Sequence, residues 1–241
     1  MRLQGKIALV TGASRGIGRA SAVALSREGA VIVGAARTEK DLDALAAEIA
    51  AAGGRATMLR TDVTQAALVA TCVARAIAAH GRIDILVNNA GVGGYRPFLE
   101  FSEADYDQIM ATNAKGTWLF CREVIPHMLR QKGGHIINVA SVAGLQGYGG
   151  EAIYCASKFA QIGLTQALDR EFWEQGIKVS AICPGGVETH FALGDGRTEG
   201  SARMKGFSTP EDVADAVVLA ALPRERSRIV NITLRPMNES T

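Results

Sequence analysis

The chain carries almost no excess of charge of either sign. Its 26 Lys and Arg residues nearly balance 24 Asp and Glu residues, so the formal net charge at pH 7 is +2. So small an excess implies neither a nucleic acid nor an anionic membrane as partner, because those surfaces select strongly basic proteins. The sequence pI of 8.4 leaves room for a local basic site that binds a small anionic ligand.

Cysteine is scarce, and its spacing does not suggest a metal site. Cys72, Cys121, Cys155 and Cys183 include no C-x-x-C pair, and no histidine stands beside them in metal-ligand spacing. We expect reduced, mostly buried thiols and no bound metal. Cys155 is expected to be a packing thiol, with a redox handle as the alternative.

No apolar run approaches the length that spans a membrane, and an apolar segment begins directly after residues 1–6, which leaves no room for a signal peptide. These absences predict a soluble cytoplasmic protein. A chain of 241 residues that is 48% hydrophobic can bury one large core. No repeat, low-complexity tract or linker divides the chain, so we expect a single domain over residues 1–241.

Short β-branched runs alternate with alanine-rich stretches of helical periodicity. The expected strands cover residues 7–10, 31–33, 56–59, 83–87, 135–139, 178–182 and 228–233. The expected helices begin near residue 17 and then cover residues 39–52, 69–77, 103–129, 151–175 and 210–222. Strands that are apolar throughout and are separated by helices predict an α/β fold, with a doubly wound parallel sheet covered by helices on both faces.

A glycine-rich turn follows the first expected strand. Gly12, Gly16 and Gly18 let the backbone approach a pyrophosphate, while the free N–H groups and dipole of the next helix favour its negative charge. Strand, turn and amphipathic helix occur in the required order, which makes the motif more specific than a lone glycine pattern. The sequence therefore predicts a dinucleotide site, with a tight turn that merely needs small residues as the alternative.

The second expected strand ends without the carboxylate that binds the adenosine ribose in many NAD sites. Residues 34–37 read Gly-Ala-Ala-Arg, so a cation, Arg37, stands there instead. A guanidinium suits a 2′-phosphate, and Arg15 in the glycine turn can approach the same group. These features favour NADP(H) over NAD(H); the alternative is an NAD(H) site with two solvated arginines.

Tyr154 and Lys158 stand four residues apart in an expected helix. This spacing puts a phenol and an ammonium on one face, about 5–6 Å apart at their Cβ atoms. Because a nearby cation favours the phenolate, the pKa of the tyrosine, roughly 10 when unperturbed, would fall toward the working range of a general acid or base. Taken alone, the pair also fits a surface tyrosine beside a solvated lysine.

Several further motifs accompany this pair. They are Thr11-Gly12-x-x-x-Gly16-x-Gly18, Asp62, Asn88-Asn89-Ala90-Gly91, Asn113, Ser141, Tyr154-x-x-x-Lys158 and Pro184-Gly185. On these motifs the chain resembles, over nearly its whole length, the short-chain dehydrogenase/reductase (SDR) family, many of whose members are 3-oxoacyl carrier-protein reductases. The resemblance implies a Rossmann-like sheet of about seven strands, commonly assembled as a homotetramer or homodimer. It also implies hydride transfer between a nicotinamide and a small carbonyl or alcohol substrate.

The resemblance and the chemistry of ketone reduction together assign the catalytic residues. Ser141 would donate a hydrogen bond to the developing oxyanion, and Tyr154 would deliver the proton. Lys158 would lower the pKa of the tyrosine and hold the nicotinamide ribose. By the resemblance, Asn113 would keep a water in line with Lys158. The alternatives are a turn residue for Ser141, a helix polar group for Asn113 and a surface side chain that keeps its charge in water for Lys158.

The resemblance also implies a set of cofactor-binding residues in the loops that follow the strands. Within it, Asp62 would contact the adenine and Thr189 would lie near the carboxamide. The set is Gly12, Ser14, Arg15, Gly16, Ile17, Gly18, Arg37, Asp62, Val63, Asn89, Ala90, Gly91, Tyr154, Lys158, Pro184, Gly185, Val187 and Thr189.

The substrate is less well defined by the sequence. A loop at about residues 187–208 is expected to be a substrate lid, with disorder as the alternative. Its charges Arg197, Arg203 and Lys205 would suit an acidic carrier protein, but residues 231–236 lack the glycine-rich ending often found in carrier-protein reductases. This departure favours a general ketone or alcohol. Candidate pocket residues are Gly93, Gly94, Tyr95, Leu145, Gln146, Gly150, Glu151, His190 and Phe191.

Two functions from other classes are the remaining alternatives. A cofactor-binding sensor or scaffold without turnover would not need Tyr154, Lys158, Ser141 and Asn113 together. A nucleotide-sugar epimerase or dehydratase shares the tyrosine and lysine but generally needs a larger substrate domain than the chain after Pro184 can build.

Overall fold

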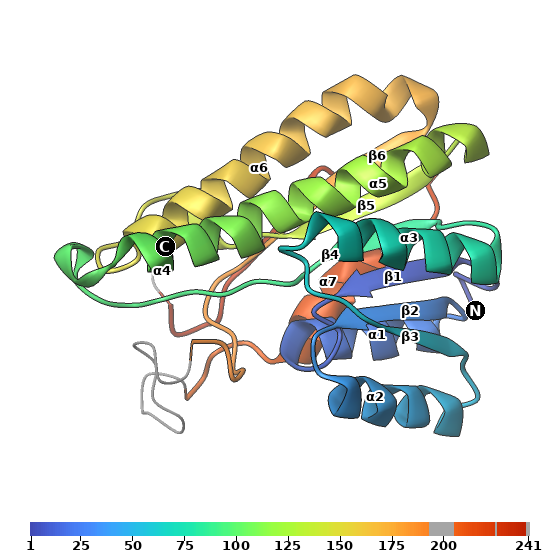
Figure 1. Ribbon diagram of the computed structural model, residues 1–241, viewed down its shortest axis with the longest axis horizontal. Coiled ribbons are helices and arrows are strands. Elements are labelled where there is room, and N and C mark those ends of the chain that lie inside the picture. Colours follow the sequence, from blue (N-terminus) through green and yellow to red (C-terminus); the bar gives the residue numbers. More distant parts are fainter. Residues whose placement is uncertain (193–204, 225, 240–241) are drawn as a thin grey trace.

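The structure is a computed structural model that describes residues 1–192, 205–224 and 226–239. In these residues, seven strands form one sheet in the order β3-β2-β1-β4-β5-β6-β7 (Figure 1). Every neighbouring pair is parallel. The strands are β1 (Ile7–Thr11), β2 (Val31–Ala36), β3 (Ala56–Arg60), β4 (Ile85–Asn88), β5 (Gly134–Val139), β6 (Ile177–Pro184) and β7 (Asn231–Leu234). The predicted parallel sheet of Rossmann type is confirmed.

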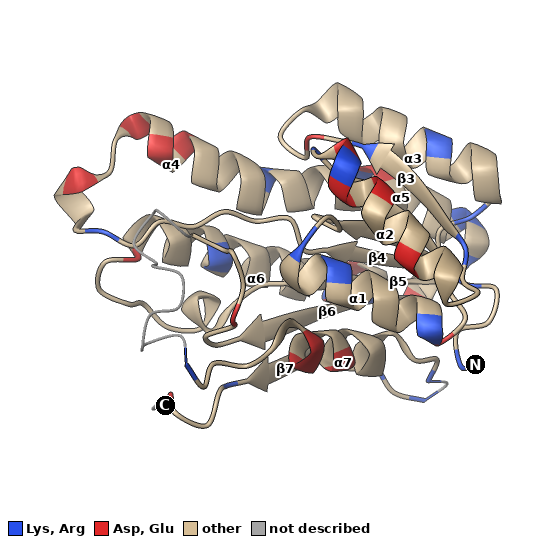
Figure 2. Cartoon of the chain, turned by 90° about the horizontal axis from the view of Figure 1, so that it is seen from below, with Lys and Arg blue, Asp and Glu red and all other residues tan. Residues whose placement is uncertain are grey.

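Helices cover both faces of the sheet. The helices of the described residues are α1 (Gly16–Arg27), α2 (Glu39–Ala51), α3 (Ala66–His80), α4 (Glu103–Met110), α5 (Gly116–Gln131), α6 (Ala152–Phe172) and α7 (Pro210–Ala221). Helices α1, α2 and α7 pack on one face, and α3, α5 and α6 pack on the other (Figure 1). None of these helices is long and apolar enough to cross a membrane. Acidic residues gather on α4, whereas Lys and Arg residues are spread over many elements (Figure 2).

Each central strand supplies side chains to two hydrophobic cores. In β1, Ala8 and Val10 pack with α1, α2 and α7, while Ile7 and Leu9 pack with α3 and α5. All five residues of β1 are buried. A strand covered on both faces needs apolar side chains at successive positions, which is why β1 is apolar without alternation.

Several expected element boundaries differ from those of the structure, and two of these differences coincide with specific contacts. The helix expected over residues 103–129 is interrupted, because a π-helical turn over Ala111–Lys115 separates α4 from α5. Such turns are frequent at functional sites, and this one carries Asn113. The last strand starts at Asn231 instead of residue 228, because the guanidinium of Arg228 binds the carboxylate of Asp169 on α6, with an Nε–Oδ1 distance of 2.8 Å.

The carboxyl ends of the central strands meet at one edge of the sheet. The strand order reverses between β1 and β4, and the register there pairs Val10 with Val87. Gly12 and Asn89 therefore follow their strands at the same level. Open α/β sheets bind ligands in the crevice at such a reversal, so the fold places the predicted motifs where a dinucleotide would bind.

Candidate functional site

A cavity of about 1300 Å³ lies at this edge of the sheet. Its walls combine the glycine turn, the loops after β4, β5 and β6, and the first turns of α6. The predicted site residues that line it are Gly12, Ser14, Arg15, Gly16, Ile17, Arg37, Asp62, Val63, Asn89, Ala90, Gly91, Ser141, Tyr154, Lys158, Pro184, Gly185, Val187 and Thr189. The fold thus brings residues from Gly12 to Thr189 together around one cavity, although they are far apart in the sequence.

Gly18 and Asn113 are the two predicted site residues that do not line this cavity. Gly18 is buried beneath the turn, and a Cβ there would collide with the backbone oxygen of Gly12. Its lack of a side chain allows α1 to pack against the turn, and the expected contact of Gly18 with a cofactor stays a prediction.

The glycine turn presents its backbone to the cavity at Gly12 and Gly16. Gly12 and Gly16 have φ angles of 64° and 53°, which only glycine adopts without strain. The amide nitrogen of the Asn89 side chain donates to the backbone oxygens of Thr11 (3.0 Å) and Gly12 (3.3 Å). Within the described residues no side chain caps the N-terminus of α1 at Arg15. Its first N–H groups therefore remain available to an anion.

Arg15, at the start of α1, and Arg37, directly after β2, both line the cavity and are exposed. Asp41 and Asp62 also line it. Oδ1 of Asp62 accepts hydrogen bonds from the backbone nitrogen (2.9 Å) and hydroxyl (2.8 Å) of Thr64, which fix its side chain. The cavity wall therefore includes two cations and an oriented carboxylate.

Tyr154 and Lys158 both project from α6 and are only 7% and 4% exposed. Nζ of Lys158 lies 5.6 Å from the centre of the Tyr154 ring. It donates to the backbone oxygen of Val139 (3.1 Å) and to Oε1 of Gln161 (2.7 Å). Burial lowers the pKa of Lys158 to about 7. The alternative of a solvated surface lysine is therefore wrong.

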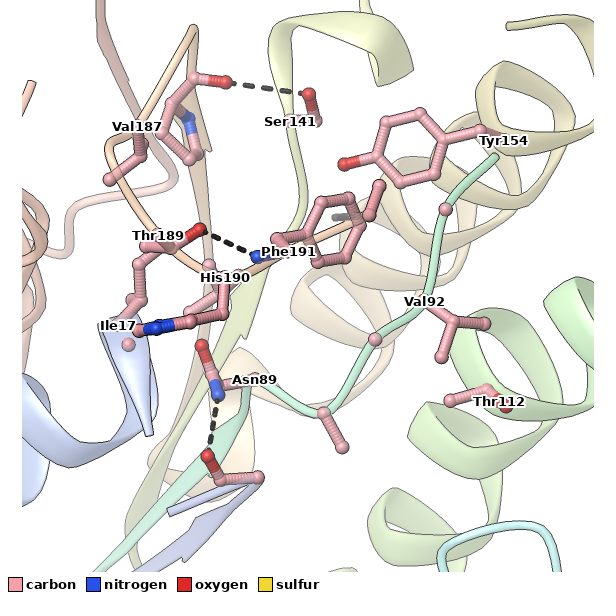
Figure 3. A pocket seen from close by; sticks show the side chains of 18 of the residues that line it. Ile17, Asn89, Val92, Thr112, Ser141, Tyr154, Val187, Thr189, His190 and Phe191 are labelled. Carbon is pink, nitrogen blue, oxygen red and sulfur yellow. Dashed lines mark hydrogen bonds between the residues drawn. The ribbon is translucent and has the colours of Figure 1, made fainter. Parts of the chain in front are cut away.

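Ser141 begins a short 3₁₀ turn directly after β5. Its hydroxyl accepts from the backbone nitrogen of Ala143 (3.1 Å) and donates to the backbone oxygen of Pro184 (3.4 Å). The hydroxyl end of Tyr154 points toward Ser141 across the cavity (Figure 3). The hydroxyl groups of Ser141 and Tyr154 therefore face one space. To donate to a ligand there, Ser141 has to break only its long hydrogen bond to the backbone oxygen of Pro184.

Aromatic side chains flank the Tyr154 ring. Its centre lies 6.2 Å from that of Tyr95 and 5.7 Å from that of Phe191. Figure 3 shows the ring of Phe191 beside that of Tyr154. Of the candidate substrate-pocket residues, Gly93, Tyr95, Glu151, His190 and Phe191 line the cavity. Gly94, Leu145, Gln146 and Gly150 are not among the lining residues. Two aromatic rings therefore flank the ring of Tyr154 in the cavity wall.

Asn113 is completely buried in the π-helical turn. Its amide nitrogen donates to the backbone oxygen of Val92 (2.8 Å) and to the hydroxyl of Ser157 (2.9 Å), and its oxygen accepts from the backbone nitrogen of Val92 (2.9 Å). The side chain thus ties the loop after β4 to α6. The role of Asn113 in holding a water stays a prediction.

Sequence reasoning missed several residues of the site. Tyr148, Phe207, Asn238 and Glu239 line the cavity, and a carboxylate oxygen of Glu239 accepts from the backbone nitrogen of Gly186 at 2.9 Å. Their positions depend on how distant loops and the segment after β7 fold back, so no local pattern marks them. The predicted lid is described only in part, because residues 193–204, with Arg197 and Arg203, lie outside the described residues.

Comparison with known proteins identifies the family. Residues 6–199 match the family model described as short chain dehydrogenase. The chain belongs to the short-chain dehydrogenase family. It is 41% identical over 226 residues to oxidoreductase UcpA of Salmonella typhimurium, covering 93% of this chain and 83% of UcpA. It is 34% identical over 226 residues to the 3-oxoacyl-[acyl-carrier-protein] reductase FabG of Thermotoga maritima, covering 92% of each.

Two solved structures of similar oxidoreductases share this fold. A metagenomic short-chain oxidoreductase in complex with NADP is 37% identical, with a TM-score of 0.86, and the match covers 99% of this chain and 100% of that one. An alcohol dehydrogenase from the archaeon Thermococcus sibiricus, complexed with 5-hydroxy-NADP, is 28% identical, with a TM-score of 0.89 and 98% of each chain covered. The predicted family is confirmed, and this short-chain dehydrogenase is an oxidoreductase.

Proposed function

We propose that this short-chain dehydrogenase transfers hydride between NADP(H) and a ketone or secondary alcohol, with Tyr154 as the general acid or base. The observation that carries the proposal is the meeting of Tyr154, Lys158 and Ser141 with the glycine turn around one cavity. A bound nicotinamide supplies or accepts the hydride. The protein's own groups bind the carbonyl, orient it and move the proton.

The two hydroxyl groups have complementary tasks. Reduction of a ketone puts negative charge on its oxygen, which needs hydrogen-bond donors already aimed at it. Ser141 and Tyr154 supply such donors from β5 and α6. Tyr154 passes its proton to that oxygen, and the ammonium of Lys158 favours the phenolate that remains. In alcohol oxidation the same phenolate accepts the proton.

The remaining walls fit a dinucleotide. Gly12 and Gly16 bring bare backbone to the cavity, and the uncapped start of α1 suits a pyrophosphate. Lys158 would hold the nicotinamide ribose, Asp62 the adenine end, and Val187 and Thr189 the carboxamide end. All four residues line the cavity, which supports their assignment.

Arg15 and Arg37 support NADP(H) as the preferred cofactor. Both residues line the cavity, and Arg37 directly follows β2, where a carboxylate would bind the ribose of NAD. A guanidinium can bind a 2′-phosphate in a bidentate way. The NADP and 5-hydroxy-NADP ligands in the two solved relatives are consistent with this choice.

The apolar wall formed by Tyr95 and Phe191 supports a ketone that carries an apolar group beside its carbonyl. A 3-oxoacyl thioester on a carrier protein is the second candidate substrate, and the 34% identity to FabG favours it. A panel that contains both kinds of substrate distinguishes the two.

We also propose a homodimer or homotetramer, consistent with exposed aromatic side chains on one side of the sheet. Trp118 on α5 and Phe159 on α6 are 43% and 46% exposed. Self-association that covers them would remove apolar surface from water. Light scattering after size exclusion measures the assembly, and a monomeric mass would contradict this proposal without affecting the catalytic one.

The decisive experiment follows NADPH absorbance with a panel of ketones, 3-oxoacyl thioesters and nucleotide sugars. Tyr154→Phe should lower turnover by about 10²–10⁴-fold, the usual contribution of general acid–base catalysis, while NADPH affinity is kept. Tyr106→Phe, at an exposed tyrosine on α4, is the control and should keep full turnover. Full turnover by Tyr154→Phe, or reaction of nucleotide sugars without net oxidation of NADPH, would overturn the proposal.

A further inference from the structure

A buried glutamine connects the lysine of the site to a neighbouring helix. Gln161 lies one turn beyond Lys158 on α6 and is 1% exposed. Its Oε1 accepts from Nζ of Lys158 at 2.7 Å, and its Nε2 donates to Oγ1 of Thr117 on α5 at 2.7 Å. Oγ1 of Thr117 in turn donates to the backbone oxygen of Asn113 at 2.8 Å. A continuous chain of hydrogen bonds thus runs from the π-helical turn to Lys158.

The chemistry of the partners determines how the amide of Gln161 is oriented. An ammonium only donates, so Lys158 requires the amide oxygen. The amide nitrogen must then find an acceptor, and Thr117 can accept because its own proton goes to Asn113. Reversing the amide would set two donors against each other at Lys158. The network therefore has one consistent direction, and each end of the buried amide has a partner.

Lys158 is held by two protein acceptors and still faces the cavity. Among the described residues its acceptors are the backbone oxygen of Val139 and Oε1 of Gln161. The third N–H is left for a ligand. Nζ lies 3.8 Å from the position that a Cβ on Gly91 would occupy, at the cavity wall. A lysine stem is flexible, so two fixed acceptors confine an otherwise mobile ammonium.

We propose that Gln161 is a positioning residue that holds the ammonium of Lys158 beside Tyr154 and favours its protonated form. The first acceptor is the backbone oxygen of Val139, which any residue at position 139 would supply. The second acceptor is present only because the side chain of residue 161 carries an amide. The inference rests on the proposed function, since it acts through Lys158.

The electrostatic setting makes this second acceptor important. Burial lowers the pKa of Lys158 to about 7, so the charge of Lys158 is finely balanced at neutral pH. An oxygen that accepts a hydrogen bond from an ammonium favours the charged form. Among the described residues, the titratable groups that face Lys158 are Tyr154 from the same helix and Cys183 from β6. Neither replaces the amide oxygen, because the cysteine is a buried thiol and the tyrosine presents the face of its ring.

The test compares Gln161→Leu with Gln161→Glu. Leucine keeps an apolar volume but removes the acceptor, whereas glutamate keeps an acceptor and adds a negative charge. We measure the NADPH dissociation constant by fluorescence titration from about pH 5.5 to 9.5, and kcat/KM over the same range. The pH above which NADPH binding weakens should move down by about one unit in Gln161→Leu and up in Gln161→Glu, each unit being a tenfold change in the proton affinity of Lys158.

A matched control separates this role from core packing. Thr165 lies one turn further along α6, is 2% exposed, and accepts a hydrogen bond from Asn138 at 2.8 Å. Thr165→Val should lower the melting temperature without moving either pH profile. Thr117→Val, which removes the other partner of the amide, should move both profiles in the same direction as Gln161→Leu but by less.

The outcomes are distinguishable. Opposite displacements for leucine and glutamate support the proposal. Unmoved profiles in both variants, with a loss of NADPH affinity in Lys158→Met, would overturn the role of Gln161 and leave the proposed function intact. If Lys158→Met changes neither NADPH affinity nor turnover, the proposed function itself fails.

Discussion

Nζ of Lys158 lies 5.6 Å from the centre of the Tyr154 ring, and both side chains are buried on one face of α6. Their four-residue spacing puts them on that face, but spacing alone does not bury a lysine. The packing of α6 against β5 and β6 removes the ammonium from water. Burial of the Lys158 ammonium therefore lowers the free energy of unfolding, and this destabilisation can be measured.

Lys158→Met should stabilise the cofactor-free protein most strongly at low pH. Burial lowers the pKa of Lys158 from 10.5 to about 7, so below pH 7 the lysine is charged in both states and its desolvation penalty is complete. Between about pH 7 and pH 10.5 the unfolded state binds more protons than the folded state. The desolvation penalty therefore shrinks as pH rises, and it disappears above pH 10.5. Urea unfolding of both proteins at about pH 6, 8 and 10 measures the difference in unfolding free energy. A difference that does not vary with pH would contradict the burial argument.

Arg37→Asp should invert the cofactor preference. A carboxylate repels the 2′-phosphate of NADPH and can bind the ribose hydroxyls of NADH. The loss of NADPH affinity should reach about tenfold or more, the scale of one hydrogen bond to a charged group. Fluorescence titration of both cofactors checks it. Arg27→Asp, the same charge change at the exposed end of α1, is the control and should leave the preference unaltered.

His135→Gln should weaken the loss of stability in acid. His135 is buried at the start of β5, with Nε2 2.7 Å from the hydroxyl of Ser180. Burial, aided by the charge of Lys178, lowers the pKa of His135 from 6.5 to about 3. Between those values only the unfolded state binds this proton, so stability falls as pH decreases.

The expected change in pH dependence is that of a single proton, the one that binds His135 in the unfolded state. Removing the histidine should flatten the dependence of the unfolding free energy on pH by up to about 1.4 kcal/mol per pH unit. Chemical denaturation at about pH 7, 5.5 and 4.5 measures the slope. Equal slopes for the variant and the natural chain would show that this residue does not carry the acid sensitivity.

Phe191→Ala should change substrate selection while leaving cofactor binding intact. The ring of Phe191 lies against that of Tyr154 and beside Gly93, so its removal opens the apolar wall of the cavity. For ketones with a bulky apolar group, kcat/KM should fall by about tenfold or more, the scale of a few lost apolar contacts. Phe98→Ala, at a side chain that is 66% exposed, is the control. An equal loss for small and bulky ketones would indicate that Phe191 does not contact the substrate.

Much of the fold could be predicted from the sequence because local periodicity reflects burial. The helix expected over residues 39–52 is confirmed as α2, and its buried residues Leu42, Leu45 and Ile49 recur at helical spacing. The break between α4 and α5 was not predicted. The sequence there keeps its helical character, and the π-helical turn arises where Asn113 binds the loop after β4.

Neighbouring residues along the chain were enough to predict the succession of strands and helices, the glycine turn, and the placement of Tyr154 and Lys158 on one helix face, because each depends on residues a few positions away. The folded structure was needed to show that Lys158 is buried, that Gln161 accepts a hydrogen bond from it, and that Glu239 binds Gly186. These features depend on contacts between distant segments, and on the removal of water from between them. A local pattern of residue types predicts neither these contacts nor the removal of water.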